Sequence, residues 1–146
     1  MPEKQTLERA RRARREGKRP TTQAGEFIRE EIHHVREGKH GARSTKQAIA
    51  IGLSKARRAG VKLGRPPKTA KARTRKSAAS ATRAARTGRT PSRSRSRGAL
   101  RALKRAPRST VSRKALARHA RQVAKRRGPA ARKRSARKAA ETRRAA

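Results

Sequence analysis

The stretch TTQAGEFIREEIHHVREG (residues 21–38) decides the fold, together with STKQAIAIGLSKARRAG (residues 44–60), which follows it after a short loop. Both segments repeat apolar residues at the three- and four-residue spacing of an amphipathic helix. They lie in a chain that is otherwise dominated by alanine and basic residues. The pattern predicts two helices, over residues 22–37 and 45–59.

Local end signals support both predicted helices. A threonine pair before the first suits a helix N-cap, and Gly38 suits its end. In the second, Ser44 and Gln47 have the spacing of a capping box, and Gly60 marks the end. The chain therefore predicts where each helix begins and stops.

The apolar residues of each predicted helix share one face. On the first they fall within an arc of roughly 140° at 100° per residue. On the second they form a stripe with Gly52 near its middle, where the missing side chain lets another backbone come close. We predict a hairpin closed by Val61 and Leu63, with the facing residues Ala24, Phe27, Ile28, Ile32 and Val35 on one helix and Ala48, Ile49, Gly52, Leu53, Ala56 and Ala59 on the other.

The large apolar residues are concentrated in this hairpin. Only 16 of 146 residues are apolar and larger than alanine, and nine of these lie between Thr21 and Leu63. With a net charge of +39, the rest of the chain has the composition of a disordered polymer. The predicted fold class is mainly α, a small central helical hairpin flanked by disordered basic segments with transient helices. A hairpin of about 40 residues is marginal alone, so a homodimer through the hairpin is one way to complete its core.

Three regions follow from these patterns. Residues 1–20 are predicted to be a basic N-terminal arm with a fraying helix, and residues 21–64 the helical hairpin module. Residues 65–146 are predicted to be a disordered basic tail. Within the tail, residues 112–127 form a possible helix with Ser112 as its N-cap and a Gly-Pro pair as its stop.

The tail carries most of the charge. Residues 65–146 contain 30 Lys and Arg against one Glu. Such a polymer gains free energy by condensing on a polyanion and releasing counterions, which predicts nucleic acid as the partner. The chain has a single aromatic residue, Phe27, so base stacking of the kind used by single-strand binders is absent. This favours duplex DNA, with an RNA- or ribosome-associated role as the alternative.

The expected phosphate contacts come from basic residues at the end of the second helix and along the tail. The second helix is expected to present its basic residues, Lys55 included, on its outer side. The candidate nucleic-acid-binding residues are Arg57, Arg58, Lys62, Arg65, Lys68, Arg73, Arg75, Lys76, Arg93, Arg95, Arg97, Arg113, Lys114, Arg118, Arg121, Lys125, Arg126, Arg127, Arg132, Lys133 and Arg134.

Half of the eight acids lie on the first helix of the hairpin and predict an acidic outer face. This face is either solvated or the docking surface for a basic tail. Glu31 is expected to reach a cation such as Lys46 or Arg43. Glu30 and His33 have the i, i+3 spacing of carboxylate-bridged metal proteins, but the second helix supplies no matching ligands, so no metal site is expected.

Catalysis finds no support in the sequence. Cysteine and aspartate are absent, no glycine-rich phosphate loop or paired-carboxylate pocket is recognisable, and the four histidines are expected in solvated contexts. We therefore expect a non-enzymatic protein with no cofactor, no metal and no catalytic residue. No apolar run approaches a membrane span, and the expected location is cytoplasmic and nucleoid-associated, or nuclear in a eukaryotic source.

Three resemblances add to this interpretation. Gly64-Arg65-Pro66 resembles the core of the AT-hook and the minor-groove arm of serine recombinases, which implies that Arg65 enters a narrow A·T groove; the alternative is a proline-stiffened linker. The tail resembles those of histone H1-like and other alanine-, lysine- and arginine-rich nucleoid proteins of bacteria, which implies a largely sequence-independent compaction of DNA. The central hairpin looks like a small bacterial module of unknown function.

Overall fold

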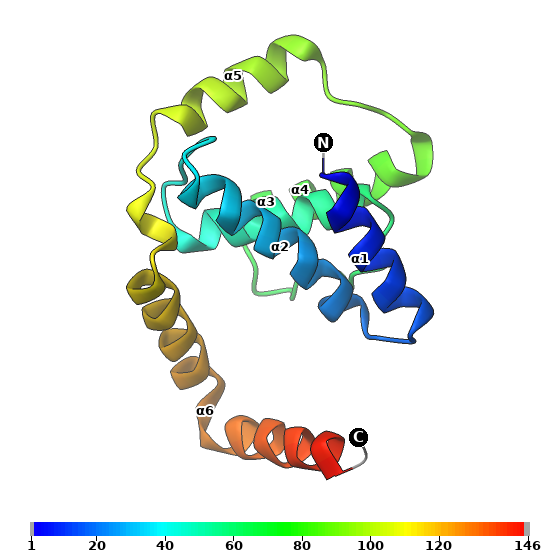
Figure 1. Cartoon of the computed structure of the whole chain (residues 1–146), viewed down its shortest axis with the longest axis vertical. Helices are drawn as coiled ribbons and strands as arrows, with labels where there is room; N and C mark the ends of the chain where they lie inside the picture. The colour runs from blue at the N-terminus through cyan, green and yellow to red at the C-terminus, as the bar shows by residue number, and fades with distance from the viewer. Residues whose placement is uncertain (1, 145–146) are drawn as a thin grey trace.

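The computed structural model describes residues 2–144, and the regular structure within that range is entirely helical. Figure 1 shows α1, α2 and α3 in the centre of the molecule, with α5 and α6 projecting away from them. The prediction of a mainly α protein is confirmed. The elements in chain order are α1 (Lys4–Arg15), α2 (Pro20–Arg36), α3 (Thr45–Arg58), α4 (Ala72–Thr87), α5 (Arg93–Lys104), the 3-10 turn η1 (Ser109–Val111) and α6 (Arg113–Arg144).

The predicted hairpin is formed by α2 and α3. Ala24 and Phe27 of α2 are fully buried, as is Ala56 of α3. The backbones approach most closely at Gly52, where a Cβ atom would lie 2.7 Å from Ile28 Cα. The prediction that this glycine allows a close contact is therefore confirmed.

The ends of α3 follow the predicted signals. Ser44 Oγ accepts a hydrogen bond from the Gln47 N–H at 3.2 Å. At the other end Gly60 takes a left-handed conformation with φ of 88°. The N–H groups of Gly60 and Val61 then donate to carbonyls in the last turn of the helix, as in a Schellman motif.

The start of α2 differs from the prediction. The helix begins at Pro20, with Arg19 as its N-cap and no side-chain capping bond. Proline is favoured at the first helical position because its fixed φ suits the helix and its missing N–H would lack a partner there. The threonine pair therefore lies inside the first turn rather than capping it.

Helix α1 packs on the hairpin instead of fraying. Ala10 is buried in one cluster with Phe27 and Ala56, and Leu7 packs against that cluster. The Arg9 guanidinium lies 3.3 Å from a carboxylate oxygen of Glu26 on α2. The hairpin core is thus completed within the chain by a third helix.

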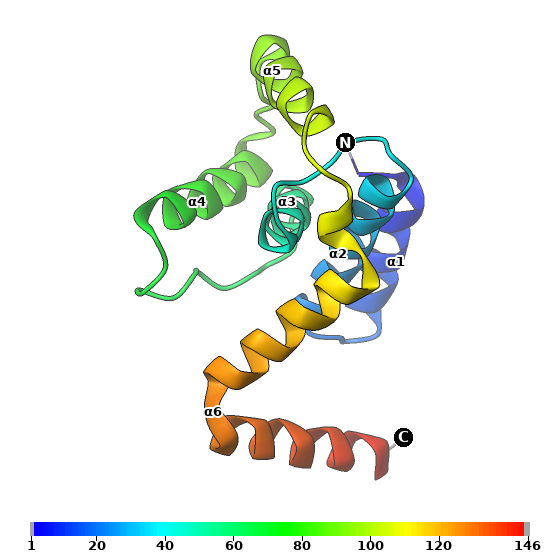
Figure 2. The same ribbon diagram turned by 90° about the vertical axis from the view of Figure 1, so that its left-hand side faces the viewer.

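The predicted disorder of residues 65–146 is wrong, because α4, α5 and α6 are helical. Alanine and arginine are strong helix formers, and a helix needs no apolar core to satisfy its own backbone. The serine-arginine run of residues 92–97, part of the tail predicted to be disordered, begins α5, where Ser92 Oγ accepts from the Arg95 N–H at 3.3 Å. Helix α4 packs beside α3 with Ala81 almost fully buried, as Figure 2 shows.

A tail segment also docks on the hairpin. Val111 of η1 is fully buried in a cluster with Val35, Ala42 and Ala48. The Arg36 Nε donates to the Val111 carbonyl at 3.2 Å. The far end of the hairpin core is therefore filled by a residue from a distant part of the chain.

The helix predicted over residues 112–127 is confirmed as the first half of α6. Ser112 Oγ accepts from the Ala115 N–H at 3.2 Å, as expected of an N-cap. Gly128, with φ of 75° and ψ of 168°, breaks the helix before Pro129. The chain then continues as a second helical arm to Arg144, and Figure 2 shows the bend between the two arms.

Candidate nucleic-acid interface

The ion pairs of the described residues are confined to the first part of the chain. Every ion pair among residues 2–144 lies between Glu3 and Lys55. The basic residues after Lys55 have no carboxylate partner within the described part of the chain. Their positive charge is therefore not balanced by carboxylates in that part of the chain.

The structure leaves nearly all of the predicted phosphate-contacting residues accessible. Twenty of the 21 are exposed, and Arg57 is half-buried. The two terminal nitrogens of Arg57 donate to the carbonyls of Leu63 at 3.0 Å and Gly64 at 2.7 Å, and burial lowers the pKa of its guanidinium. Arg57 thus holds the chain just before Arg65, which is itself exposed.

A basic groove lies between the N-termini of α3 and α6. It encloses about 520 Å³ and is lined by Lys46, Lys114 and Arg118, with the capping serines Ser44 and Ser112. Both helix N-termini carry partial positive charge from unpaired backbone N–H groups, and no carboxylate lines the groove. This combination of backbone and side-chain charge suits a phosphate group.

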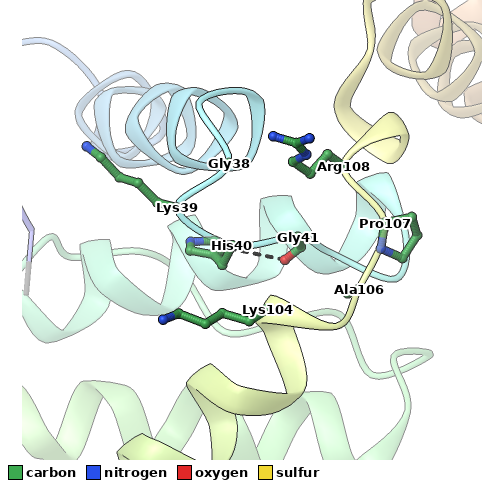
Figure 3. Close-up of a pocket in the computed structure, with 8 residues that line it drawn as sticks. All are labelled: Gly38, Lys39, His40, Gly41, Lys104, Ala106, Pro107 and Arg108. Carbon is green, nitrogen blue, oxygen red and sulfur yellow. Dashed lines mark hydrogen bonds between the residues drawn. The ribbon is translucent and has the colours of Figure 1, made fainter.

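A second basic pocket lies between the loop after α2 and the segment after α5. It encloses about 600 Å³, and Figure 3 shows Lys39 and His40 on one side with Lys104 and Arg108 on the other. Lys39 pairs with Glu3 and Glu37, both at 3.2 Å, and these carboxylates raise the pKa of its ammonium group. Lys104 and Arg108 were missed by the sequence analysis, because only the docked tail brings them to this loop.

The acidic face predicted for α2 is partly wrong. Glu30 and Glu31 are buried, with relative exposures of 5% and 0%. Glu31 pairs with Lys55 at 2.9 Å rather than with Lys46 or Arg43, and Lys55 therefore does not face outward as expected. Burial alone would lower the pKa of Lys55, but Glu31 and Glu30 outweigh it and raise that pKa. The reason is that Lys55 lies in the last turn of α3, on the side that faces Glu30 and Glu31 of α2.

The expectation of solvated histidines is also wrong at two positions. The side chains of His34 and His40 are 12% and 10% exposed. His40 Nδ1 lies 3.1 Å from the Gly41 carbonyl, as Figure 3 shows. Both rings lie against the buried carboxylates of α2.

Residues 4–69 match a family of unknown function (DUF6496), so the chain is similar to that family over α1, α2, α3 and the segment that carries Arg65. No curated protein and no solved structure matches the chain. None of the helices in residues 2–144 is both long enough and apolar enough to cross a membrane.

Proposed function

We propose that this chain is a non-enzymatic DNA-binding protein that coats or compacts duplex DNA, largely without regard to sequence, through phosphate contacts of its Arg- and Lys-rich helices. The observation that carries the proposal is the separation of charge. All ion pairs of the described chain lie before residue 56, while twenty of the 21 candidate residues are exposed and have no carboxylate partner in that part of the chain. Such a surface binds phosphates and releases their counterions.

The helices of the tail determine how its basic side chains can meet a duplex. Helices α4 and α5 and the two arms of α6 present basic side chains along separate rods, and a rod of this kind fits the major groove of duplex DNA. At one charge per roughly 1.7 Å of duplex, the 30 basic residues of 65–146 match about 50 Å of DNA. The kink at Gly128 lets the two arms of α6 follow different directions along the partner.

The basic groove between α3 and α6 would hold one phosphate at a fixed position. Contacts of this kind set the orientation of a protein on the duplex without reading its sequence. A nucleoid-associated location follows from the same proposal. The homodimer through the hairpin stays a prediction.

The test is binding of labelled duplex DNA and of an RNA hairpin of equal length, measured by fluorescence anisotropy from about 50 to about 400 mM salt. Affinity for DNA should fall with a log–log slope of about −0.9 for each phosphate contacted. The triple variant Arg93→Gln, Arg95→Gln and Arg97→Gln should reduce that slope by roughly 2 to 3.

The matched control is Arg11→Gln, Arg14→Gln and Arg15→Gln, which removes the same charge from exposed positions of α1. This control should change the slope less than the α5 variant does. Failure to bind duplex DNA at about 50 mM salt would overturn the proposal. Binding of RNA alone would replace DNA with RNA as the partner, and release from cell lysate by RNase but not by DNase would lead to the same conclusion.

A further inference from the structure

Three potential metal ligands converge beside the hairpin, next to the second basic pocket, which His40 also lines. Glu31 and His34 lie on α2, and His40 lies in the loop that follows it. One ligand atom from each lies within 4.8 Å of the other two. The two rings are arranged edge to face, with centroids 6.1 Å apart.

One pair of the ligand atoms already has the spacing found in a tetrahedral zinc site. Zn²⁺ binds imidazole nitrogen and carboxylate oxygen at about 2.0–2.2 Å, so two neighbouring ligand atoms of a tetrahedron are about 3.4 Å apart. His40 Nε2 lies 3.4 Å from Glu31 Oε1. This pair needs no rearrangement to hold one ion.

The outer hydrogen bonds of both histidines set the tautomers that a metal requires. His40 Nδ1 lies 3.1 Å from the Gly41 carbonyl, and His34 Nε2 lies 2.9 Å from Glu3 Oε1. Both partners are acceptors, so these nitrogens carry the N–H. The other nitrogens, His40 Nε2 and His34 Nδ1, then lie 3.4 Å from Glu31 Oε1 and 4.0 Å from Glu30 Oε1. A cation, either a second ring proton or a metal ion, fits between nitrogen and carboxylate in this arrangement.

The buried carboxylates supply further reason for a cation. Glu30 and Glu31 are both buried, and Lys55 is the one ammonium that pairs with them in the described chain. Lys55 contacts Glu31 Oε2, yet neither oxygen of Glu31 has an aligned hydrogen bond among the described residues. A buried carboxylate is costly unless cations and hydrogen bonds surround it, and Oε1, whose ion-pair partner is His40 Nε2 at 3.4 Å, can also bind an ion.

We propose that Glu31 Oε1, His34 Nδ1 and His40 Nε2 bind one Zn²⁺ ion, with water in the fourth position. Glu3 and the Gly41 carbonyl orient the two histidines from outside, and Lys55 holds the second oxygen of Glu31. The site is structural. It ties α2 to the loop whose Gly41 N–H donates to the Leu103 carbonyl at 2.9 Å, so the ion stabilises the surface on which the tail docks.

The proposal is independent of DNA binding and is tested without DNA. Full-length protein without a histidine tag is stripped of metal and titrated with Zn²⁺ by calorimetry, and with Co²⁺ by visible absorption. We expect one Zn²⁺ per chain and a Co²⁺ spectrum typical of four-coordinate nitrogen and oxygen ligands. Bound Zn²⁺ should also raise the thermal unfolding temperature, because the unfolded chain lacks the site.

The variants His34→Gln and His40→Gln should each weaken Zn²⁺ binding by more than about 100-fold, and Glu3→Ala by about 10-fold through loss of the outer hydrogen bond. The matched control is His33→Gln, since His33 is exposed on the same helix, and it should bind Zn²⁺ like the original chain. Circular dichroism checks that each variant keeps its helices. The site is overturned if the original chain binds no Zn²⁺ at about 1 mM, if His34→Gln and His40→Gln bind as well as it does, or if His33→Gln loses binding equally.

Discussion

Gly52 on α3 lies directly against the backbone of Ile28 on α2. A Cβ atom at Gly52 would meet Ile28 Cα at 2.7 Å and Ile28 N at 3.0 Å. Backbone atoms cannot move aside as the end of a flexible side chain can. The glycine therefore sets the distance between the two helices of the hairpin.

The first prediction is that Gly52→Ala destabilises the fold by about 1–3 kcal/mol, because the helices must separate to admit the methyl group. The measurement is urea unfolding followed by circular dichroism. Gly25→Ala is the matched control: Gly25 lies inside α2, and a Cβ there would meet nothing within 4 Å. That change should stabilise the protein by up to about 1 kcal/mol through helix propensity, and equal effects of the two substitutions would contradict the close contact.

The second prediction concerns the lysine beside the buried acids. Lys55→Met leaves Glu30 and Glu31 without their ammonium partner and should destabilise the protein by about 3–5 kcal/mol at neutral pH. Lys46→Met, at an exposed position of the same helix, should change the unfolding free energy by less than about 0.5 kcal/mol. Lowering the pH should reduce the loss of unfolding free energy caused by Lys55→Met, because protonation of Glu30 and Glu31 removes their negative charge. If the difference in unfolding free energy between Lys55→Met and the original chain does not change with pH, lost packing rather than lost charge is its cause.

The third prediction is a loss of stability in acid. Burial would raise the pKa of Glu30, but hydrogen bonds, that from Lys55 foremost, outweigh it and hold the pKa below the ordinary value of 4.5. A lowered pKa stabilises the folded state above the unfolded pKa, and this contribution is lost as the pH falls through the folded value. Unfolding free energies should therefore fall below about pH 4.5.

The pKa values of Glu3 and Glu16 are also lowered. The contribution of Glu30 to the acid sensitivity is therefore obtained by comparing the original chain with Glu30→Gln. That variant should start less stable at neutral pH and show a shallower decline in acid. Guanidinium unfolding at a series of pH values measures both curves. Parallel curves would exclude Glu30 as a source of the acid sensitivity.

The fourth prediction separates Arg65 from the other basic residues. If Arg65 enters a minor groove, Arg65→Ala should reduce the preference for A·T-rich over G·C-rich duplexes as well as the affinity. Arg73→Ala, at an exposed position of α4, should lower affinity equally for both duplexes. Competition titrations at fixed salt provide the comparison. Identical behaviour of the two variants would leave the segment around Pro66 as a stiff linker.

The fifth prediction tests the docking of the tail. Val111→Ala removes two methyl groups from a fully buried site and should cost about 2 kcal/mol. It should also speed hydrogen exchange at Gly41 and Ala42, whose N–H groups donate to carbonyls of the tail. Val123→Ala, at a half-buried position of α6, should leave exchange at those two amides unchanged. Unchanged exchange in Val111→Ala would mean that the backbone bonds hold the segment without the valine.

Much of the hairpin could be predicted because its signals are local. The cap at Ser44, the Schellman end at Gly60 and the stripe around Phe27 each depend on residues within a few turns of one another. The disorder predicted for the tail was wrong for an equally local reason. Charge and the lack of large apolar residues argue against a core, but they do not prevent alanine and arginine from forming helix.

The candidate sites were less accessible to prediction because they join distant residues. The groove between α3 and α6 needs Lys46 and Lys114 side by side, and the proposed zinc site needs His40 to fold back on Glu31. The second helix supplies no metal ligand, and only the fold brings the loop residue His40 beside α2. No spacing rule indicates a ligand that a loop brings into place.

The sequence by itself therefore determined the helical class, the position of the hairpin, the ends of α3 and the concentration of positive charge after residue 64. These depend on backbone propensities, caps and composition, which act over a few residues or by simple addition. Only the tertiary structure decided that α1 and Val111 complete the core, that Glu30 and Glu31 are buried, and that Lys55 is their partner. Each of these depends on which side chain fills a particular space, and that choice is made by packing among segments far apart in the chain.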